Sequence, residues 1–519
     1  MRSILGLMGT KLYKLIGKNI KVKISFLIFG LASTIWFLVR VIPKPQRATY
    51  PCMRVAAPVM SSFVIYLLTF FSSVFAFRKV SNSYKRGRYF VMAVFLVLAI
   101  VCSFVYYGNK AEEINALTRN SRKIEANKPI GVERGIYPGR VVWIHNPNVA
   151  KWDGINGNWW DDANTSQAEV DKMVPAALTS LTGEKSLSRA WDALFRYFNK
   201  AKKMKDEGYL PNQKIAIKIN ENNNSSHANN NELNASPQMV LALVRSLIQD
   251  AGVPQKNITV FDASRFITDN VFDKCHAEFP DVVFVDNVGG DGRIRATYVE
   301  KAIPYSVDNG PLAQGLATCA ICADYLINMA LLKGHIGQGV TLCAKNYYGV
   351  TNIFADWRKN AHNNFNQDGA GKPKYMTFVD FLGHKDLGEK TMLFLIDGLY
   401  GSKSVAGPPS PKWKMAPFNG NWTGSLFVSE DGVAIDAVCL DFLSNEWPDA
   451  PDMKYSDNYL IEAALANDPP SKTFYDPERD KVRCKSLGVM EHWNNADEKK
   501  YSRNLGKKYG IELICKDIN

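Results

Sequence analysis

The chain has 519 residues, of which 46% are hydrophobic and 22% are charged, and its formal net charge is +13. This composition excludes a disordered chain, a collagen-like repeat and a small disulfide-stapled module. The positive charge is confined to residues 1–125, which hold 19 Lys and Arg residues against three acids. Because the remaining residues sum to −3, the overall charge gives no reason to expect nucleic-acid binding.

Three apolar runs separate clusters of basic residues in the first part of the chain. They cover residues 24–39 (up to 42 if the run continues through Arg40), 55–77 and 89–107, and about 20 such residues suffice for a helix to cross a bilayer. We therefore expect three transmembrane helices in a membrane anchor over residues 1–107, followed by a linker over 108–135. Segments rich in Lys and Arg stay on the cytoplasmic side of a membrane. The distribution of basic residues around the three runs therefore predicts that the N-terminus lies inside and residues 108–519 lie outside. The expected location is the inner (cytoplasmic) membrane, multi-pass, with the bilayer as a partner and an extracytoplasmic main domain.

After the linker, short β-branched runs alternate with amphipathic stretches. We expect strands at 141–145, 215–219, 258–262, 282–285, 325–329, 393–397 and 426–429, and helices at 166–181, 187–204, 236–251, 375–382 and 432–444. Strand–helix alternation with continuously apolar strands predicts an α/β fold with a mainly parallel, doubly wound sheet. The α/β domain should cover residues 136–519, with its core at 139–446 and a C-terminal helical extension at 447–519.

Ligands of such sheets bind beyond the carboxyl ends of the strands, and polar residues gather at these positions in this sequence. Asn220 follows the second expected strand, Asp262 ends the third, and Asp397 ends the sixth. Lys333 and His335 follow the strand at 325–329. A shared cleft at this edge of the sheet is the natural expectation.

Five sequence blocks in order resemble the bacterial and archaeal domain-of-unknown-function family 362. They are Lys214-Ile-Ala-Ile-Lys-Ile-Asn220, Asp324-Tyr-Leu-Ile-Asn328 with Lys333-Gly-His335, Thr341-Leu-Cys-Ala-Lys345-Asn346, Ile396-Asp397-Gly398 and Ser429-Glu-Asp431-Gly-Val-Ala434-Ile-Asp436. The resemblance covers roughly residues 139–446. The family has no agreed activity, so the resemblance implies a fold rather than a reaction.

A fainter resemblance links the chain to the N-terminal domain of nickel-dependent lactate racemase. His335 and Lys345 repeat the ten-residue spacing of a histidine and the cofactor-tethering lysine in that enzyme. Ser264, however, stands where the racemase has a histidine base, and the Gly-Gly before the lysine is missing. The resemblance thus implies a shared scaffold without racemase activity.

Lys333, His335 and Lys345 are the leading candidates for catalysis. A histidine exchanges protons near neutral pH, and neighbouring lysines would lower the pKa of its imidazolium and bind an anionic substrate. Asn346 could orient that anion. The structural alternative is a loop of solvated lysines with a histidine that caps the next helix.

Asn220, Asp262, Ser264 and Arg265 are the candidate substrate-binding residues besides Asn346. An arginine at a strand end can grip a carboxylate or phosphate through two parallel hydrogen bonds. The alternative is a turn in which Asp262 accepts backbone N–H groups.

Cofactor assignments are few. Asp397 and Asp431 could bind a divalent cation such as Mg²⁺ or Ca²⁺, although Asp431 also stands where a helix N-terminus favours an acid. Cys319, Cys322 and Cys343 lie among alanines and isoleucines, which favours burial over an iron–sulfur cluster. No Walker A or dinucleotide-binding glycine motif occurs.

Three functions fit these observations. The first is an enzyme that acts on a small anionic or polyhydroxy ligand by acid/base or metal-assisted chemistry. The second is a non-catalytic solute-binding or sensory domain tethered to the membrane. The third is a scaffold, which would expose an apolar patch and lack a deep cleft. An enzyme requires the His335 ring to be aimed into a pocket, whereas a binding domain requires only hydrogen-bonding groups that line one.

Overall fold

The computed structural model describes residues 125–518 apart from 204, 311, 336–337, 354–363, 366–372, 449, 451–452 and 454, together with Ile35 and Val39. The chain divides into two units, residues 1–119 and 120–519, and all elements below belong to the second. Its strands are β1 (Ile130–Gly131), β2 (Arg140–His145), β3 (Ile215–Lys218), β4 (Ile258–Asp262), β5 (Val283–Asp286), β6 (Ile294–Arg295), β7 (Tyr298–Val299), β8 (Leu316–Ala317), β9 (Tyr325–His335), β10 (Gly339–Thr341), β11 (Thr391–Ser402), β12 (Ser425–Ser429), β13 (Val489–Met490) and β14 (Glu512–Asp517). The α-helices are α4 (Gln167–Thr182), α5 (Leu187–Lys203), α6 (Pro237–Gln249), α7 (Asp269–His276), α8 (Thr318–Ile321), α9 (Cys343–Asn346), α10 (Thr377–Gly383), α11 (Gly432–Glu446) and α12 (Asn458–Ala464).

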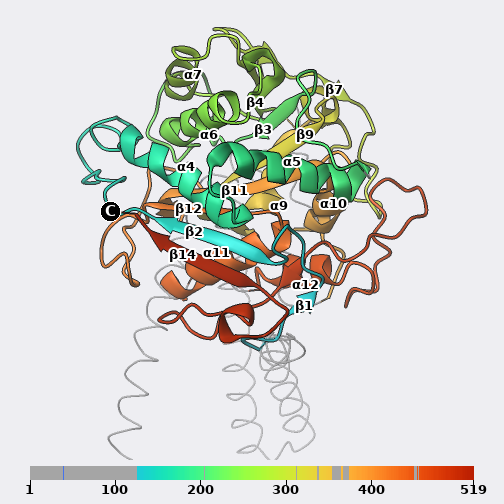
Figure 1. Cartoon of the computed structure of the whole chain (residues 1–519). Coiled ribbons are helices and arrows are strands. Elements are labelled where there is room, and N and C mark those ends of the chain that lie inside the picture. Colours follow the sequence, from blue (N-terminus) through green and yellow to red (C-terminus); the bar gives the residue numbers. More distant parts are fainter. Residues whose placement is uncertain are drawn as a thin grey trace, which may run out of the picture. The chain divides into compact units, whose positions relative to one another are not determined.

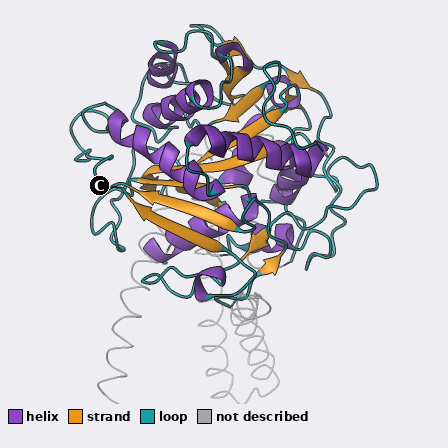
Figure 2. Cartoon of the chain, viewed as in Figure 1, coloured by secondary structure: helices purple, strands orange, loops and turns teal. Residues whose placement is uncertain are grey.

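A ten-stranded sheet organises this unit, with strand order β14-β2-β12-β11-β9-β3-β4-β5-β6 and β10 paired to β9 (Figures 1 and 2). Six of the nine pairings between its described strands are parallel, and three are antiparallel. The alternating sequence pattern correctly indicates an α/β fold, but the sheet is mixed. The cause is β12, which lies antiparallel to both β11 and β2, so the chain returns from β11 by a loop rather than by a crossover helix.

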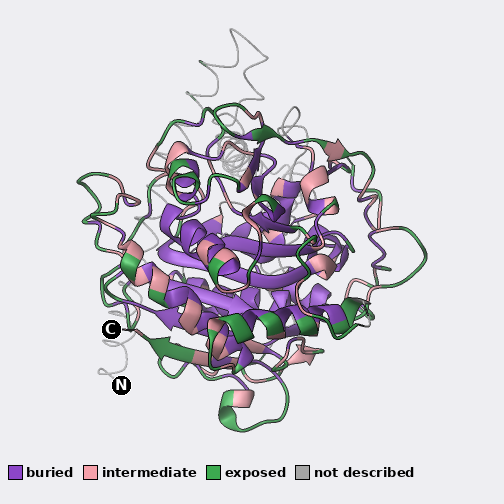
Figure 3. Ribbon diagram, turned by 45° about the horizontal axis from the view of Figure 1, so that its top comes forward, coloured by how far each residue is buried: buried purple, intermediate pink, exposed green. Residues whose placement is uncertain are grey.

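Helices cover both faces of the sheet, and each face has its own hydrophobic core. α4, α5, α6 and α7 pack on one face, and α9, α10, α11 and α12 pack on the other (Figure 1). The inner strands β3, β9, β11 and β12 are buried on both sides (Figure 3), which explains why their sequences are continuously apolar. Side chains of these inner strands can therefore reach solvent only at the strand ends.

The expected transmembrane helices are corrected by the structure. Among the described residues, no helix is long and apolar enough to cross a membrane. The longest, α4 and α5, have 16 and 17 residues and are amphipathic, whereas a span needs about 20 apolar residues. The expectation of three spans, and of a multi-pass inner-membrane protein, is thus wrong for the described part of the chain. The three apolar runs themselves lie outside the described residues, apart from Ile35 and Val39.

The two ends of the expected α/β domain also differ from expectation. The last residues of the expected linker are part of the fold, because Ile130 and Gly131 pair with β13 and the Arg134 guanidinium binds Glu389 at 2.7 Å. In place of a helical extension, residues 447–519 contain the seven-residue helix α12, the short β13 and β14. β14 forms the edge of the sheet by pairing in parallel with β2.

The expected strands are all present, but β9 and β11 are longer than the sequence pattern indicates. β9 continues through Lys333 to His335, and β10 folds back on it so that Thr341 pairs with Lys333 and Gly339 pairs with His335. Lys333 and His335 therefore belong to a paired strand rather than to a loop. Lys333 also pairs with Ser402 at the end of β11.

Candidate functional site

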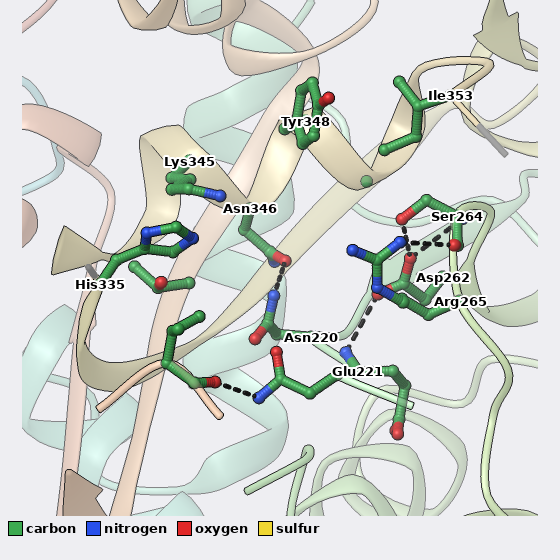
Figure 4. A pocket seen from close by; sticks show the side chains of 14 residues that line it. Asn220, Glu221, Asp262, Ser264, Arg265, His335, Lys345, Asn346, Tyr348 and Ile353 are labelled. Carbon is green, nitrogen blue, oxygen red and sulfur yellow. Dashed lines mark hydrogen bonds between the residues drawn. The ribbon is translucent and has the colours of Figure 1, made fainter. Parts of the chain in front are cut away.

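A pocket of about 250 Å³ opens at the carboxyl ends of the parallel strands β3, β4 and β9 (Figure 4). Seven of the residues expected at a site line it: Asn220, Asp262, Ser264, Arg265, His335, Lys345 and Asn346. They come from three strand ends and from α9, so the expected convergence is observed. Lys333 is the exception among the expected catalytic residues, because it is fully buried and does not line the pocket.

Asn346 is the centre of the hydrogen-bond network beneath the pocket. Its Oδ1 accepts from the Lys218 ammonium at 3.0 Å and from Asn220 Nδ2 at 3.2 Å. Its Nδ2 donates to Asn328 Oδ1 at 2.8 Å and to the backbone oxygens of Lys218 and Met329. Asn346 thus joins α9 to β3 and β9 and has no free group for the anion that the sequence assigned to it.

The helix that carries Lys345 and Asn346 is held by a carboxylate of α11, 93 residues further along the chain. Asp436 of α11 accepts the backbone N–H groups of Cys343 at 2.8 Å and Ala344 at 3.0 Å, and it also accepts from the Tyr459 hydroxyl. These are the orphan N–H groups at the start of a helix. Asp436 is therefore a positioning residue for the pocket wall.

A buried ion pair forms the floor of the pocket. Lys218 Nζ lies 3.1 Å from Asp262 Oδ2, and both side chains are at most 2% exposed. The same carboxylate accepts from the backbone N–H of Glu221 and from the N–H and hydroxyl of Ser264. Burial lowers the pKa of Lys218, and Asp262 opposes this shift. Asp262 and Ser264 consequently hold the turn together, as the structural alternative described.

Two cationic groups face the pocket without a carboxylate partner. Lys345 makes no ion pair with any described residue, and its Nζ lies 5.4 Å from the centre of the Tyr348 ring. Burial, reinforced by the nearby Arg265 and Lys218 charges, lowers the pKa of Lys345 to about 7. The Arg265 guanidinium donates to the Ser264 backbone oxygen at 2.9 Å. Figure 4 shows His335 and Lys345 on one side of the pocket and Arg265 on the other.

Two further ionisable side chains beside the pocket are buried and lack hydrogen-bond partners among the described residues, namely Lys333 and Glu221. Burial lowers the pKa of Lys333 to about 7, and the Lys345 charge acts in the same direction. Burial raises the pKa of the Glu221 carboxyl well above its usual value, and the nearby Asp262 carboxylate adds to this rise. Unpartnered buried ionisable groups cost stability and are concentrated at functional sites.

The two aspartates expected to bind a cation do not come together. Asp397 accepts the backbone N–H groups of Ser236 and Leu399 and so lies against the start of α6. Asp431 caps α11, where it accepts the backbone N–H groups of Val433 and Ala434. It also accepts the backbone N–H groups of Arg134 and Val489. Because β12 runs antiparallel to β11, Asp431 lies at the opposite end of the strands from the pocket. Both carboxylates serve helix N-termini instead.

The cysteines expected to be buried differ from one another in exposure. Cys343 is buried in α9, Cys319 is half-buried, and Cys322 is exposed. In the described ranges no group of three or more His, Cys, Asp or Glu side chains is arranged to hold a metal ion.

Seven pocket residues were not predicted as site residues from the sequence: Glu221, Asn222, Thr341, Tyr348, Gly349, Ile353 and Val405. Glu221 and Asn222 directly follow the predicted Asn220, and Gly349 lies four residues after Lys345. Their closeness to a predicted strand end or to a predicted site residue is the signal that could have identified them. Lys218, a single lysine within an apolar strand, was a further signal for a buried partner.

Gly349 is expected to be intolerant of a side chain. A Cβ at this position would lie 2.8 Å from Lys218 Nζ and 3.0 Å from Asp262 Oδ1. We expect Gly349→Ala to lower the free energy of unfolding by about 1–3 kcal/mol, the usual cost of overpacking, as measured by urea denaturation. Gly208→Ala is the control, since its Cβ would meet only the movable Asp192 carboxylate. Equal stability of the two variants would contradict this close packing.

Fold and pocket together define a mixed α/β protein whose ligand pocket lies at the carboxyl ends of its parallel strands. Residues 215–441 match the model of the domain of unknown function DUF362, so this part of the chain carries a domain of that family. The match includes β3, β4, β9, α9 and most of α11, which supply the pocket and the Asp436 anchor. Neither the curated proteins nor the solved structures include a match to this chain.

Proposed function

We propose that this protein is an enzyme that binds a small anionic ligand in the pocket and transfers a proton on it. The observation that supports this most is the cationic Lys345 and Arg265, which face a pocket while the adjacent Asp262 is already occupied by Lys218, Glu221 and Ser264. A carboxylate or phosphate would supply the missing counter-charge. Acid/base chemistry is favoured over metal assistance, because Asp397 and Asp431 lie away from the pocket.

Lys345 is the group that we assign to proton transfer. A lysine with a pKa of about 7 is present in both protonation states at neutral pH, which suits a general base or acid. The His335 ring, on the same side of the pocket (Figure 4), is a second group able to exchange a proton. Arg265 remains charged throughout and would hold the anion while Lys345 reacts.

Lys345→Ala is expected to weaken the binding of sulfate at pH 6.5 by at least about tenfold, since a charge-assisted hydrogen bond contributes roughly 1.5–3 kcal/mol. Isothermal titration calorimetry on the full chain measures this effect. Sulfate keeps its charge across the pH range used. Lys185→Ala removes an exposed lysine outside the pocket and serves as the control. Equal sulfate affinity of the two variants would refute the proposed anion site.

The affinity for sulfate should also decrease with pH. Below pH 7 Lys345 is protonated and binds the anion fully. Above a pH of about 7, Lys345 must take up a proton when the anion binds. The affinity for sulfate therefore falls by about tenfold per pH unit. An affinity that stays constant between pH 6.5 and pH 9 would show that Lys345 is not part of the anion site.

Lys345→Arg separates an enzyme from a binding domain. Arginine retains the positive charge but cannot lose a proton near neutral pH, so the variant should bind sulfate and lose proton transfer. Proton transfer is measured by NMR as solvent deuterium incorporation into a panel of small carboxylates and phosphate esters. Incorporation that persists in Lys345→Arg would assign the chemistry to another group. Absence of incorporation in the unaltered protein, with sulfate binding intact, would favour the binding domain.

A further inference from the structure

The hydrogen-bond network fixes the orientation of the Asn220 amide. The Lys218 ammonium can only donate, so the Asn346 atom that it contacts must be the amide oxygen. Asn346 Nδ2 correspondingly faces the backbone oxygens of Lys218 and Met329. Asn220 must therefore present its NH₂ group to the Asn346 oxygen. Its own Oδ1 is left buried, with no donor among the described residues.

The orientation of Asn222 is fixed in a similar way by two carbonyl groups. Its side-chain nitrogen donates to the Leu233 oxygen at 2.7 Å and to the Val405 oxygen at 2.8 Å. Carbonyl oxygens only accept, so Asn222 Oδ1 is the atom that stays available, and no described residue donates to it. Both Asn220 and Asn222 line the pocket. This part of the wall thus consists of hydrogen-bond acceptors.

The pocket therefore has a cationic part, made by Lys345 and Arg265, and an acceptor part, made by Asn220 and Asn222. All four residues line the same pocket, and Figure 4 shows Asn220 below Lys345 and Arg265. An anion alone satisfies the first part and leaves the second without donors. The buried Asn220 Oδ1 carries a desolvation penalty as long as it has no donor, and a ligand that supplies a hydroxyl or ammonium donor removes this penalty.

We propose that the pocket selects small anions that carry a hydrogen-bond donor next to the anionic group, with the carboxylate or phosphate on Lys345 and Arg265 and the donor on the oxygens of Asn220 and Asn222. This inference rests on the proposed function and adds the substrate class to it. The shared chemistry is an anionic group with a neighbouring hydroxyl or ammonium. Polyhydroxy acids and phosphorylated polyols both have it, and matched probes distinguish them.

The test compares probes that differ only in their hydroxyl groups. Glycerate is compared with propionate, and glycerol 3-phosphate with n-propyl phosphate, by isothermal titration calorimetry on the full chain at pH 6.5. We expect the hydroxyl-bearing member of at least one pair to bind at least about tenfold more tightly, as one or two additional hydrogen bonds provide. The pair with the larger preference identifies the anionic group.

Asn222→Leu should abolish this preference by weakening the hydroxyl-bearing probe about tenfold and leaving its partner probe unchanged. Asn224→Leu, at an exposed position in the same loop, should retain the preference. Equal affinities within both pairs for the unaltered protein would overturn the inference, as would a preference that survives Asn222→Leu. If neither pair binds, and sulfate does not bind either, the proposed anion site itself fails. The comparison on the unaltered protein decides the question even if a variant does not fold.

Discussion

Replacing Lys333 by methionine is expected to stabilise the protein while weakening its anion binding. The Lys333 ammonium is fully buried on β9 and has no hydrogen-bond partner among the described residues. Removing such a group and keeping the length of its side chain relieves the cost of burying a charge. The lysine also adds a positive charge behind Lys345, so its loss reduces the attraction for an anion. Opposite effects on stability and binding are typical of functional residues.

The size of the stabilisation should depend on pH. Burial lowers the pKa of Lys333 from its usual 10.5 to about 7, so the folded protein binds this proton less readily than the unfolded chain. The destabilisation by Lys333 is complete below pH 7 and disappears as the pH approaches 10.5. We expect Lys333→Met to gain about 2–4 kcal/mol at pH 6.5 and clearly less at pH 9. Urea unfolding followed by tryptophan fluorescence measures both values.

Lys390→Met is the matched control for this experiment. Lys390 is also largely buried, but its Nζ donates to the backbone oxygens of Ala320 and Ile321 and pairs with Asp386 at 2.8 Å. Its removal leaves these acceptors unsatisfied, so we expect destabilisation. If Lys333→Met proves less stable than the unaltered protein at pH 6.5, Lys333 has a structural role and the assignment of an uncompensated charge is incorrect.

The location of the pocket could be predicted from the sequence because it depends on local signals. Apolar runs mark β3, β4 and β9, and parallel strands end at the same edge of a sheet. Asn220, Asp262 and His335 directly follow or end these runs, so their convergence needs only the strand directions. Lys345 and Asn346 were found through their family block, since no periodicity places α9 next to β3.

The sequence-based predictions were wrong where pairing between distant segments of the chain decides the geometry. The apolar run of β12 does not reveal its antiparallel direction, which carries Asp431 to the opposite end of the strands from the pocket. The pairing of β14 with β2 joins segments more than 350 residues apart in the chain, and it replaced an expected helical extension. The acceptor role of Asn220 was equally hidden, because it is imposed by Lys218 through Asn346. The sequence alone does not show whether the oxygen or the NH₂ group of an asparagine side chain will face a ligand.

Loss of the Asp262 carboxylate is expected to destabilise the protein more than loss of the lysine paired with it. Lys218 Nζ is fully buried, and its only ion pair among the described residues is the one with Asp262 Oδ2 at 3.1 Å. Without Asp262 the ammonium retains only the neutral oxygens of Ile219 and Asn346. Breaking a buried pair by removing one partner typically costs about 3–5 kcal/mol. We expect a loss of this size for Asp262→Leu.

Lys218→Met should cost less, because Asp262 has other donors. The carboxylate would still accept from the Glu221 N–H at 3.0 Å and from the N–H and hydroxyl of Ser264. The double variant Lys218→Met/Asp262→Leu should recover part of the loss, since no unpaired charge remains. Urea unfolding of both single variants and the double variant measures the coupling between the residues, and Asp281→Leu, an exposed acid outside the pocket, is the control.

The pH dependence of Asp262→Leu distinguishes the unpaired ammonium from a simple loss of packing. Burial already lowers the pKa of Lys218, and Asp262 opposes that shift. Without the carboxylate the pKa should fall further, so the variant should be least stable at low pH and recover as the pH rises and Lys218 loses its proton. A destabilisation independent of pH would assign the effect to the vacated volume. A double variant no more stable than Asp262→Leu would show that the charge of Lys218 does not limit the stability of the pocket floor.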